Sequence, residues 1–168
     1  MHNFKHLSQK TIPLILLASL LVIGGALYYS QSISISPQDM KESVAIKDHW
    51  KETLTLAQYH ALREAGTEAP FTGVLNHETR KGTYYSVGCD KPLFRSEQKY
   101  DSGTSWPSFW APITEDALVL RKEGGLLDDR TEVLDTCGSH LGHVFDDGPQ
   151  PTGKRFCMNS VALYFVPD

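Results

Sequence analysis

The chain has 168 residues and a mass of 18.8 kDa, enough for one domain with a real core plus a short appendage. Its 40% apolar and 21% charged residues exclude disordered and collagen-like chains. The net charge is −4 although two lysines lie in the first ten residues, so the remainder is more acidic still and does not favour a nucleic-acid partner. Three cysteines are too few for a disulfide-rich scaffold and leave an odd thiol.

The N-terminus has the pattern of an export signal. Residues 1–10 contain Lys5 and Lys10 and no acid, and residues 12–29 carry no charge. This run is close to the roughly 20 residues that span a bilayer as a helix, and the basic flank keeps the N-terminus in the cytoplasm. We therefore expect a cytoplasmic leader over residues 1–10 and a signal anchor over residues 11–30. A cleaved signal peptide, cut near residues 24–26, and a buried core helix are the alternatives.

This leader predicts a single-pass membrane protein whose remaining chain lies on the periplasmic or extracellular side, or a secreted protein if the leader is cleaved. In an oxidising compartment disulfides persist. Residues 31–53, rich in Ser, Lys and Asp, are expected to form a tether that includes a little helix.

One helix is predicted over about residues 55–65. Thr55 and Gln58 have the spacing of a capping box, and Gly66 marks the end. Five later runs of β-branched and aromatic residues predict strands, at residues 83–87, 117–121, 131–134, 141–145 and 160–166. No helical pattern alternates with them, so the fold class is mainly β. Neither G-x-G-x-x-G nor a P-loop supports nucleotide chemistry.

The cysteines and histidines are the candidate reactive residues. Cys157 follows Arg155, whose charge favours a thiolate, although a lone cysteine can also be a small buried hydrophobe. His140 and His143 are structural residues, catalytic groups or, with Cys137, zinc ligands. A structural zinc site needs four Cys or His ligands, and the set here is incomplete.

Six ordered fragments carry a specific resemblance. They are GTEAPFTG (66–73), PLF (92–94), YDSGTSWPSF (100–109), HLGHVF (140–145), DGP with PTG (147–153) and RFCMNS (155–160). The sequence closely resembles the B-type methionine sulfoxide reductases, which reduce the R epimer of methionine sulfoxide. The resemblance covers about residues 54–166, so we assign residues 54–168 to this domain. It implies two antiparallel β-sheets with short peripheral helices.

The resemblance also implies roles for individual residues. Cys157 matches the nucleophile that attacks the sulfoxide sulfur, and His140 and His143 match the pair that protonates its oxygen. Trp106 matches the aromatic wall for the S-methyl group, and Asn159 matches an active-site residue that orders the hydrogen bonds. A thiolate on one side and an acid on the other are what a sulfoxide needs, because oxide leaves only after protonation.

The implied reaction is thiol-dependent repair of oxidised proteins or peptides, with free methionine sulfoxide as a further possible substrate. The implied product on the enzyme is a sulfenic acid at Cys157, which a thioredoxin-like protein or a small thiol reduces. We expect a monomer that contacts the membrane through its N-terminal helix and binds no nucleic acid.

The chain departs from the family pattern at the position of the family's resolving cysteine, where it has no cysteine. Many members carry a cysteine where Thr104 stands, and Ser105 is the next residue. The usual internal disulfide with Cys157 cannot form there. Recycling must therefore use Cys89, Cys137 or an external thiol.

The second departure concerns zinc, which many members bind through two C-x-x-C pairs. Here Ser86 replaces the first cysteine of one pair, and the second pair keeps only Cys137. One cysteine thus survives from each pair, so we hypothesise that a Cys89–Cys137 disulfide replaces the metal and that the protein needs no cofactor.

Two rival functions remain open at this stage. A non-catalytic binding module would keep the fold to recognise oxidised peptides, and Thr104 is the one feature in its favour. A Cys–His hydrolase would use Cys157 with His143, but the sequence shows no signature of an oxyanion site.

Overall fold

The structure, a computed structural model, describes residues 36–124 and 129–168, and of residues 46–48 only the backbone. The expected leader and signal anchor, residues 1–30, lie outside the described part. In the part that is described, no helix is both long and apolar enough to cross a membrane.

The helix α2 (Pro37–Thr53) occupies most of the segment expected to be a tether, so the helix there is much longer than the little helix expected. Its start is stabilised locally, because Ser36 N–H donates to Asp39 and Asp39 N–H donates to the Ser36 hydroxyl, both at 3.1 Å. Pro37 at the first helical position adds a preset φ. Met40 and Val44 are both more than half exposed, so this helix lacks the apolar stripe by which helices are recognised in a sequence.

Residues 47–168 form a compact unit, which contains the helix α3 (Leu56–Glu64) and both sheets. The predicted helix over residues 55–65 is confirmed, and both hydrogen bonds of the capping box between Thr55 and Gln58 are present. Ala61 and Leu62 are its buried residues, and the helix packs against β7 (His140–Phe145) and the 3-10 turn η4 (Ser160–Ala162).

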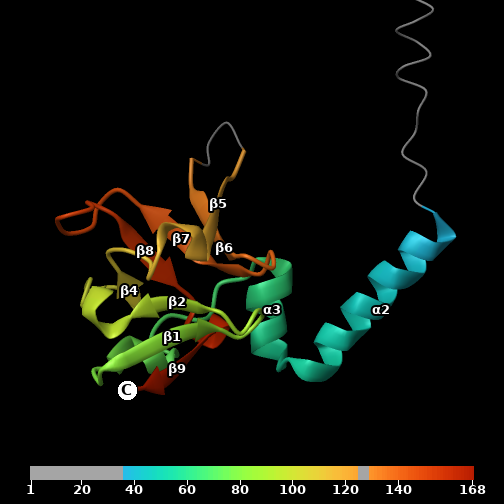
Figure 1. The fold of residues 1–168 in the computed structure, drawn as a ribbon, viewed down its shortest axis with the longest axis horizontal. Helices are drawn as coiled ribbons and strands as arrows, with labels where there is room; N and C mark the ends of the chain where they lie inside the picture. The colour runs from blue at the N-terminus through green and yellow to red at the C-terminus, as the bar shows by residue number, and fades with distance from the viewer. Residues whose placement is uncertain (1–35, 125–128) are drawn as a thin grey trace, which may run out of the picture. The chain divides into compact units, whose positions relative to one another are not determined.

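Two antiparallel sheets make up this unit, as expected, and Figure 1 shows their arrangement. The first sheet has the order β2-β1-β9, with β2 Pro92–Arg95, β1 Gly82–Ser86 and β9 Leu163–Pro167. The second has the order β3-β4-β8-β7-β6-β5, with β3 Lys99–Tyr100, β4 Ser108–Phe109, β8 Arg155–Met158, β6 Thr131–Asp135 and β5 Leu118–Lys122.

The strand predictions locate β1, β5, β6, β7 and β9 and miss β2, β3, β4 and β8. The missed strands have two to four residues, too few for a periodic pattern. The run over residues 160–166 is also not all strand. Its first three residues form η4, because the Glu68 carboxylate accepts the N–H groups of Ser160 and Val161 at 2.7 and 3.0 Å.

Aromatic packing fills the core and supports β4, next to which β8 is placed. Phe109 of β4 stacks on Phe94 at 4.2 Å between ring centroids and meets Tyr84 edge-on at 4.9 Å. All three side chains are fully buried. Burying a large aromatic ring stabilises by about 2–3 kcal/mol, so this cluster holds the short strand firmly.

Candidate active site

One row of paired residues crosses the six-stranded sheet and carries the candidate chemistry. In register, Tyr100 lies opposite Ser108, Ser108 opposite Cys157 and Cys157 opposite His143. His143 in turn lies opposite Glu132, and Glu132 opposite Arg121. Directly opposed residues of antiparallel strands share a face and have Cβ atoms about 5 Å apart. The pairing of the sheet therefore aligns a thiol, an imidazole and a carboxylate on one face.

A small pocket of about 160 Å³ opens beside this row. Trp106, His143, Cys157 and Asn159 line it, together with Phe145 and Thr67. A larger cleft of about 590 Å³ runs along Arg80, Lys99 and Thr104, but Cys157 is not in its lining. Of these two, the smaller pocket is the candidate site because it combines a thiol with an imidazole.

Cys157 is the free cysteine of the chain and is half-buried. Burial raises the pKa of its thiol, while the Arg155 guanidinium and hydrogen bonds from Thr104 and Ser108 act in the opposite direction and do not fully offset it. Arg155 is itself held by Asp147 through two hydrogen bonds of 2.8 and 2.9 Å. The thiol is therefore mostly protonated at neutral pH and needs a base to become a nucleophile.

The two histidines occupy different positions. His143 lines the pocket, where burial lowers its pKa although the neighbouring Glu123 favours the charged form. Its Nε2 lies 3.3 Å from a Glu123 carboxylate oxygen. His140 is buried and is not in the lining; its ring centroid lies 5.3 Å from that of His143. Of the two histidines predicted as site residues, the structure places His143 in the pocket lining and His140 next to it.

Asn159 and Trp106 fix the loop that forms one wall of the pocket. The Asn159 amide donates to the carbonyls of Gly66 and Leu141 and accepts from Glu68 N–H at 3.0 Å. Trp106 Nε1–H donates to the Glu68 carbonyl at 3.2 Å. Glu68 and Glu132 were not predicted as site residues. The partners of these two acidic side chains lie far along the chain or on a neighbouring strand, so no sequence motif marks them as site residues.

Comparisons with known proteins identify the family of the chain. The family model described as the SelR domain matches residues 54–167. The chain is 50% identical over 120 residues to the peptide methionine sulfoxide reductase MsrB of Methanosarcina barkeri, covering 71% of this chain and 84% of that protein. The protein of the same name from Pseudomonas putida is 50% identical over 121 residues, covering 71% and 91%. The chain belongs to the MsrB family. The resemblance drawn from the six sequence fragments is thereby confirmed.

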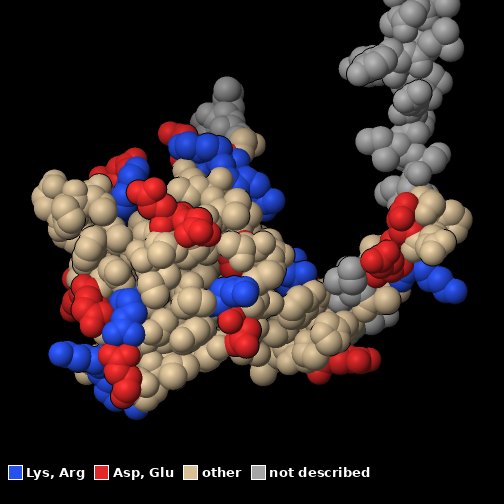
Figure 2. Space-filling view, viewed as in Figure 1, with Lys and Arg blue, Asp and Glu red and all other residues tan. Residues whose placement is uncertain are grey.

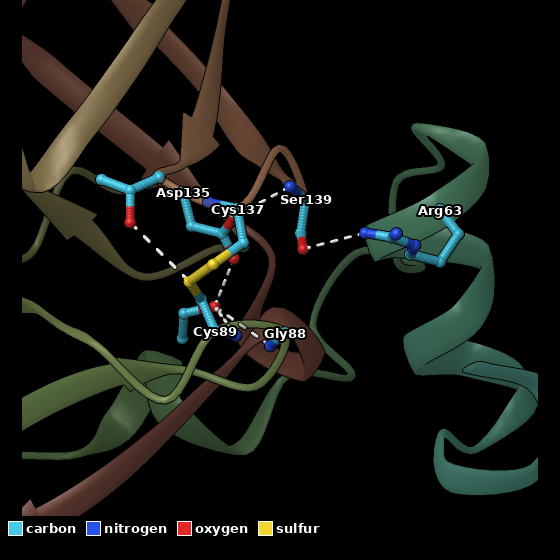
Figure 3. Close-up of a disulfide and its surroundings, with 8 residues drawn as sticks. Arg63, Gly88, Cys89, Asp135, Cys137 and Ser139 are labelled. Atoms are coloured by element: carbon cyan, nitrogen blue, oxygen red, sulfur yellow. Dashed lines mark hydrogen bonds between the residues drawn. A yellow bond between two sulfur atoms is a disulfide. The ribbon is translucent and has the colours of Figure 1, made fainter. Parts of the chain in front are cut away.

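Cys89 and Cys137 are joined by a disulfide in the structure, as hypothesised from the two incomplete C-x-x-C pairs (Figure 3). The oxygen ligands nearby are also engaged. The Ser86 hydroxyl donates to Asp135 at 2.6 Å, and the same carboxylate accepts the N–H groups of Cys137 and Ser139 at 3.0 and 2.8 Å.

This arrangement tests the fit of the family's zinc. Potential ligand atoms of Cys89, Asp135 and Cys137 lie within 4.8 Å of one another. However, zinc binds thiolates, and both sulfurs are used in the disulfide while the carboxylate is used in hydrogen bonds. The residues in this bonded state do not fit a zinc site.

Proposed function

We propose that this protein reduces the R epimer of methionine sulfoxide in oxidised proteins and peptides, with Cys157 as the nucleophile. The observation that carries the proposal is the pairing of Cys157 with His143 across β8 and β7, beside a pocket walled by Trp106. The small pocket suits a methyl group and one oxygen and leaves the rest of a peptide outside, so peptide-bound sulfoxide is the favoured substrate.

The first half-reaction forms a bond between Cys157 Sγ and the substrate sulfur. His143, neutral at pH 7 because its pKa is lowered, takes the proton of the Cys157 thiol. The imidazolium then donates this proton to the sulfoxide oxygen as the S–O bond breaks, so that hydroxide rather than oxide leaves. Hydroxide then attacks Cys157 Sγ, and the bond between Sγ and the substrate sulfur breaks with its electron pair going to that sulfur, which leaves as methionine. The products are methionine and a sulfenic acid at Cys157, so sulfur is reduced in the substrate and oxidised in the enzyme.

The second half-reaction requires two external thiols. One thiol condenses with the sulfenic acid, releasing water and leaving a mixed disulfide at Cys157; a second thiol displaces Cys157 as a thiol and becomes part of the disulfide product. Thr104 is not a thiol, and Cys89 and Cys137 are already bonded to each other. A thioredoxin-like protein or a small thiol is therefore the proposed reductant, and no metal or other cofactor is needed.

Turnover of a dabsyl-methionine-R-sulfoxide with dithiothreitol, compared with the S epimer, tests the reaction. We expect reduction of R alone, and loss of this activity in Cys157→Ser. If the folded, reduced protein turns over neither epimer, the site is kept for binding and the proposal is wrong. In a single turnover without reductant, dimedone should label Cys157; a disulfide that includes Cys157 would instead identify Cys89 or Cys137 as the resolving thiol.

The leader and the disulfide together support an exported, membrane-anchored enzyme. We propose that residues 11–30 hold the domain on the periplasmic or extracellular side, where an oxidising environment preserves the Cys89–Cys137 bond. Fractionation of cells and protection of the domain from added protease test this. An exported domain should be digested by protease added outside an intact cytoplasmic membrane. A shortened, soluble product would favour the secreted form. A domain that is digested only after the cytoplasmic membrane is broken would contradict export.

A further inference from the structure

Glu132 of β6 is a buried carboxylate with a complete set of charged partners. Its side chain is 2% exposed. One oxygen lies 2.8 Å from His140 Nδ1, and the other accepts from Arg121 Nε and Nη2 at 2.7 and 2.6 Å. Burial alone would raise the pKa of Glu132, but the hydrogen bonds from His140 and Arg121 outweigh it and the pKa is lowered. The carboxylate is therefore ionised at neutral pH.

This ionisation fixes the position of one hydrogen on His140. An ionised carboxylate only accepts hydrogen bonds, so the Nδ1 atom at 2.8 Å must carry a hydrogen and donate it. The other nitrogen, Nε2, is buried and has no hydrogen-bond partner among the residues that the structure describes. A buried polar atom without a partner is costly, by about 1–3 kcal/mol, and points to a group that binds there.

Burial distinguishes this pair from the corresponding contact of His143. Glu123, which contacts His143 at 3.3 Å, is 28% exposed, and its side chain also meets Arg130. Glu132 and His140 are 2% and 3% exposed and cannot exchange their partners for water. The buried couple is therefore a fixed arrangement, whereas the couple at the pocket is accessible to solvent and substrate.

We propose that Glu132 is a positioning residue of the reductase, which holds His140 with its hydrogen on Nδ1, so that the buried Nε2 is the hydrogen-bond acceptor of a ring that lies beside His143. The inference rests on the proposed function, and it adds to that function the residue that sets the state of His140. Glu132 itself does not touch the substrate; it acts through the histidine ring.

The variant Glu132→Gln in the full chain tests the proposal. Glutamine has the same shape but can donate as well as accept, so it no longer dictates which ring nitrogen carries hydrogen. With the peptide R-sulfoxide and dithiothreitol, we expect kcat to fall by roughly 10²-fold, the contribution of one positioned acid–base group, with KM changed much less. In ¹⁵N NMR spectra, the ring signals of His140 should change from those of the tautomer with hydrogen on Nδ1 to those of a mixture of the two tautomers.

Asp135→Asn is the matched control, because it also neutralises a fully buried carboxylate on the same strand. Asp135 bonds to Ser86 and to backbone N–H groups, and to no histidine among the residues that the structure describes. It should lower stability and leave kcat and the His140 spectrum unchanged in the folded protein. An equal loss of kcat in both variants, with His140 unchanged, would reduce Glu132 to a structural role.

The wild-type spectrum alone can overturn the proposal. A His140 ring without hydrogen on Nδ1 would contradict it even if Glu132→Gln fails to fold. Failure of the proposed function is a separate result, because it appears as wild-type protein inactive toward both epimers regardless of the NMR outcome. Addition of the R-sulfoxide to Cys157→Ser should shift the Nε2 signal of His140, and the S epimer should not.

Discussion

Replacing Cys89 and Cys137 together by serine is expected to lower the free energy of unfolding by about 4 kcal/mol. The bond closes a loop with a sequence separation of 48 residues, and the chain-entropy relation gives about 4 kcal/mol for a loop of this length at 25 °C. It also joins the turn between β1 and β2 of the three-stranded sheet to the turn between β6 and β7 in the other sheet. Its loss therefore removes a covalent link between the two sheets. For a domain of this size, the midpoint of thermal unfolding should fall by roughly 15 °C.

Urea unfolding of the wild-type protein and the double variant, each with and without dithiothreitol, measures this contribution. Reductant should destabilise the wild type to near the level of the variant and leave the variant unchanged, since only the wild type contains the bond. A thiol count in the denatured, unreduced wild type should find one free thiol, that of Cys157. Cys157→Ser serves as the control for the loss of a thiol that is not bonded.

Two results would refute this reasoning. Three free thiols in the unreduced protein would mean that the bond is not formed. One free thiol together with equal stability of wild type and variant, at equal denaturant dependence, would mean that the bond forms but the unfolded chain is not restrained by it.

Three further outcomes are expected. Alkylation of Cys157 should accelerate as pH rises to at least about 9 and be slower in Arg155→Ala, because burial raises the thiol pKa and Arg155 lowers it; a plateau near pH 7 would contradict this. Thr104→Cys, at a position whose hydroxyl lowers the pKa of the Cys157 thiol, should form an internal disulfide with Cys157 after one turnover, measured as loss of both thiols; a persistent sulfenic acid would contradict it. Gly142→Ala should lower stability by more than about 2 kcal/mol in urea unfolding, because its Cβ would collide with the Cys157 carbonyl across β7 and β8, and a fully stable variant would show that the pairing has room.

Lysine, arginine, aspartate and glutamate lie intermixed on the face drawn in Figure 2. This matches a composition in which neither sign dominates strongly. A mixed surface of this kind favours solubility more than attraction to a polyanion.

The β-rich class and five strands could be predicted because runs such as residues 131–134 combine β-branched residues with clear turn signals. The strand β8 could not, because a run of four residues is too short for a periodic pattern, although Arg155 and Cys157 share one face and buried Phe156 and Met158 share the other. This alternation is visible in the sequence only when the partner strands are known. The full length of the helix α2 was missed for a different reason, because its capping is local but its apolar stripe is lacking.

Some residues of the candidate site could be predicted from the sequence, and others could not. Trp106, Asn159, His143 and Cys157 were predicted from motifs, and the structure brings all four to one pocket. The partner of His140 was not predicted, because it depends on the pairing of β6 with β7 and on the irregularity in their register beside Val133. A carboxylate eight residues before a histidine has no significance until the strands are aligned.

The order of the three cysteines along the chain has a consequence for biosynthesis. Cys89 and Cys137 precede Cys157 along the chain, so during vectorial synthesis the native disulfide partners emerge before the third thiol does. If the domain is exported as proposed, oxidation that keeps pace with emergence closes the Cys89–Cys137 pair while no competing thiol is present. Cys157 then joins the sheet with β8, one of the last strands along the chain, when its thiol is the only one left.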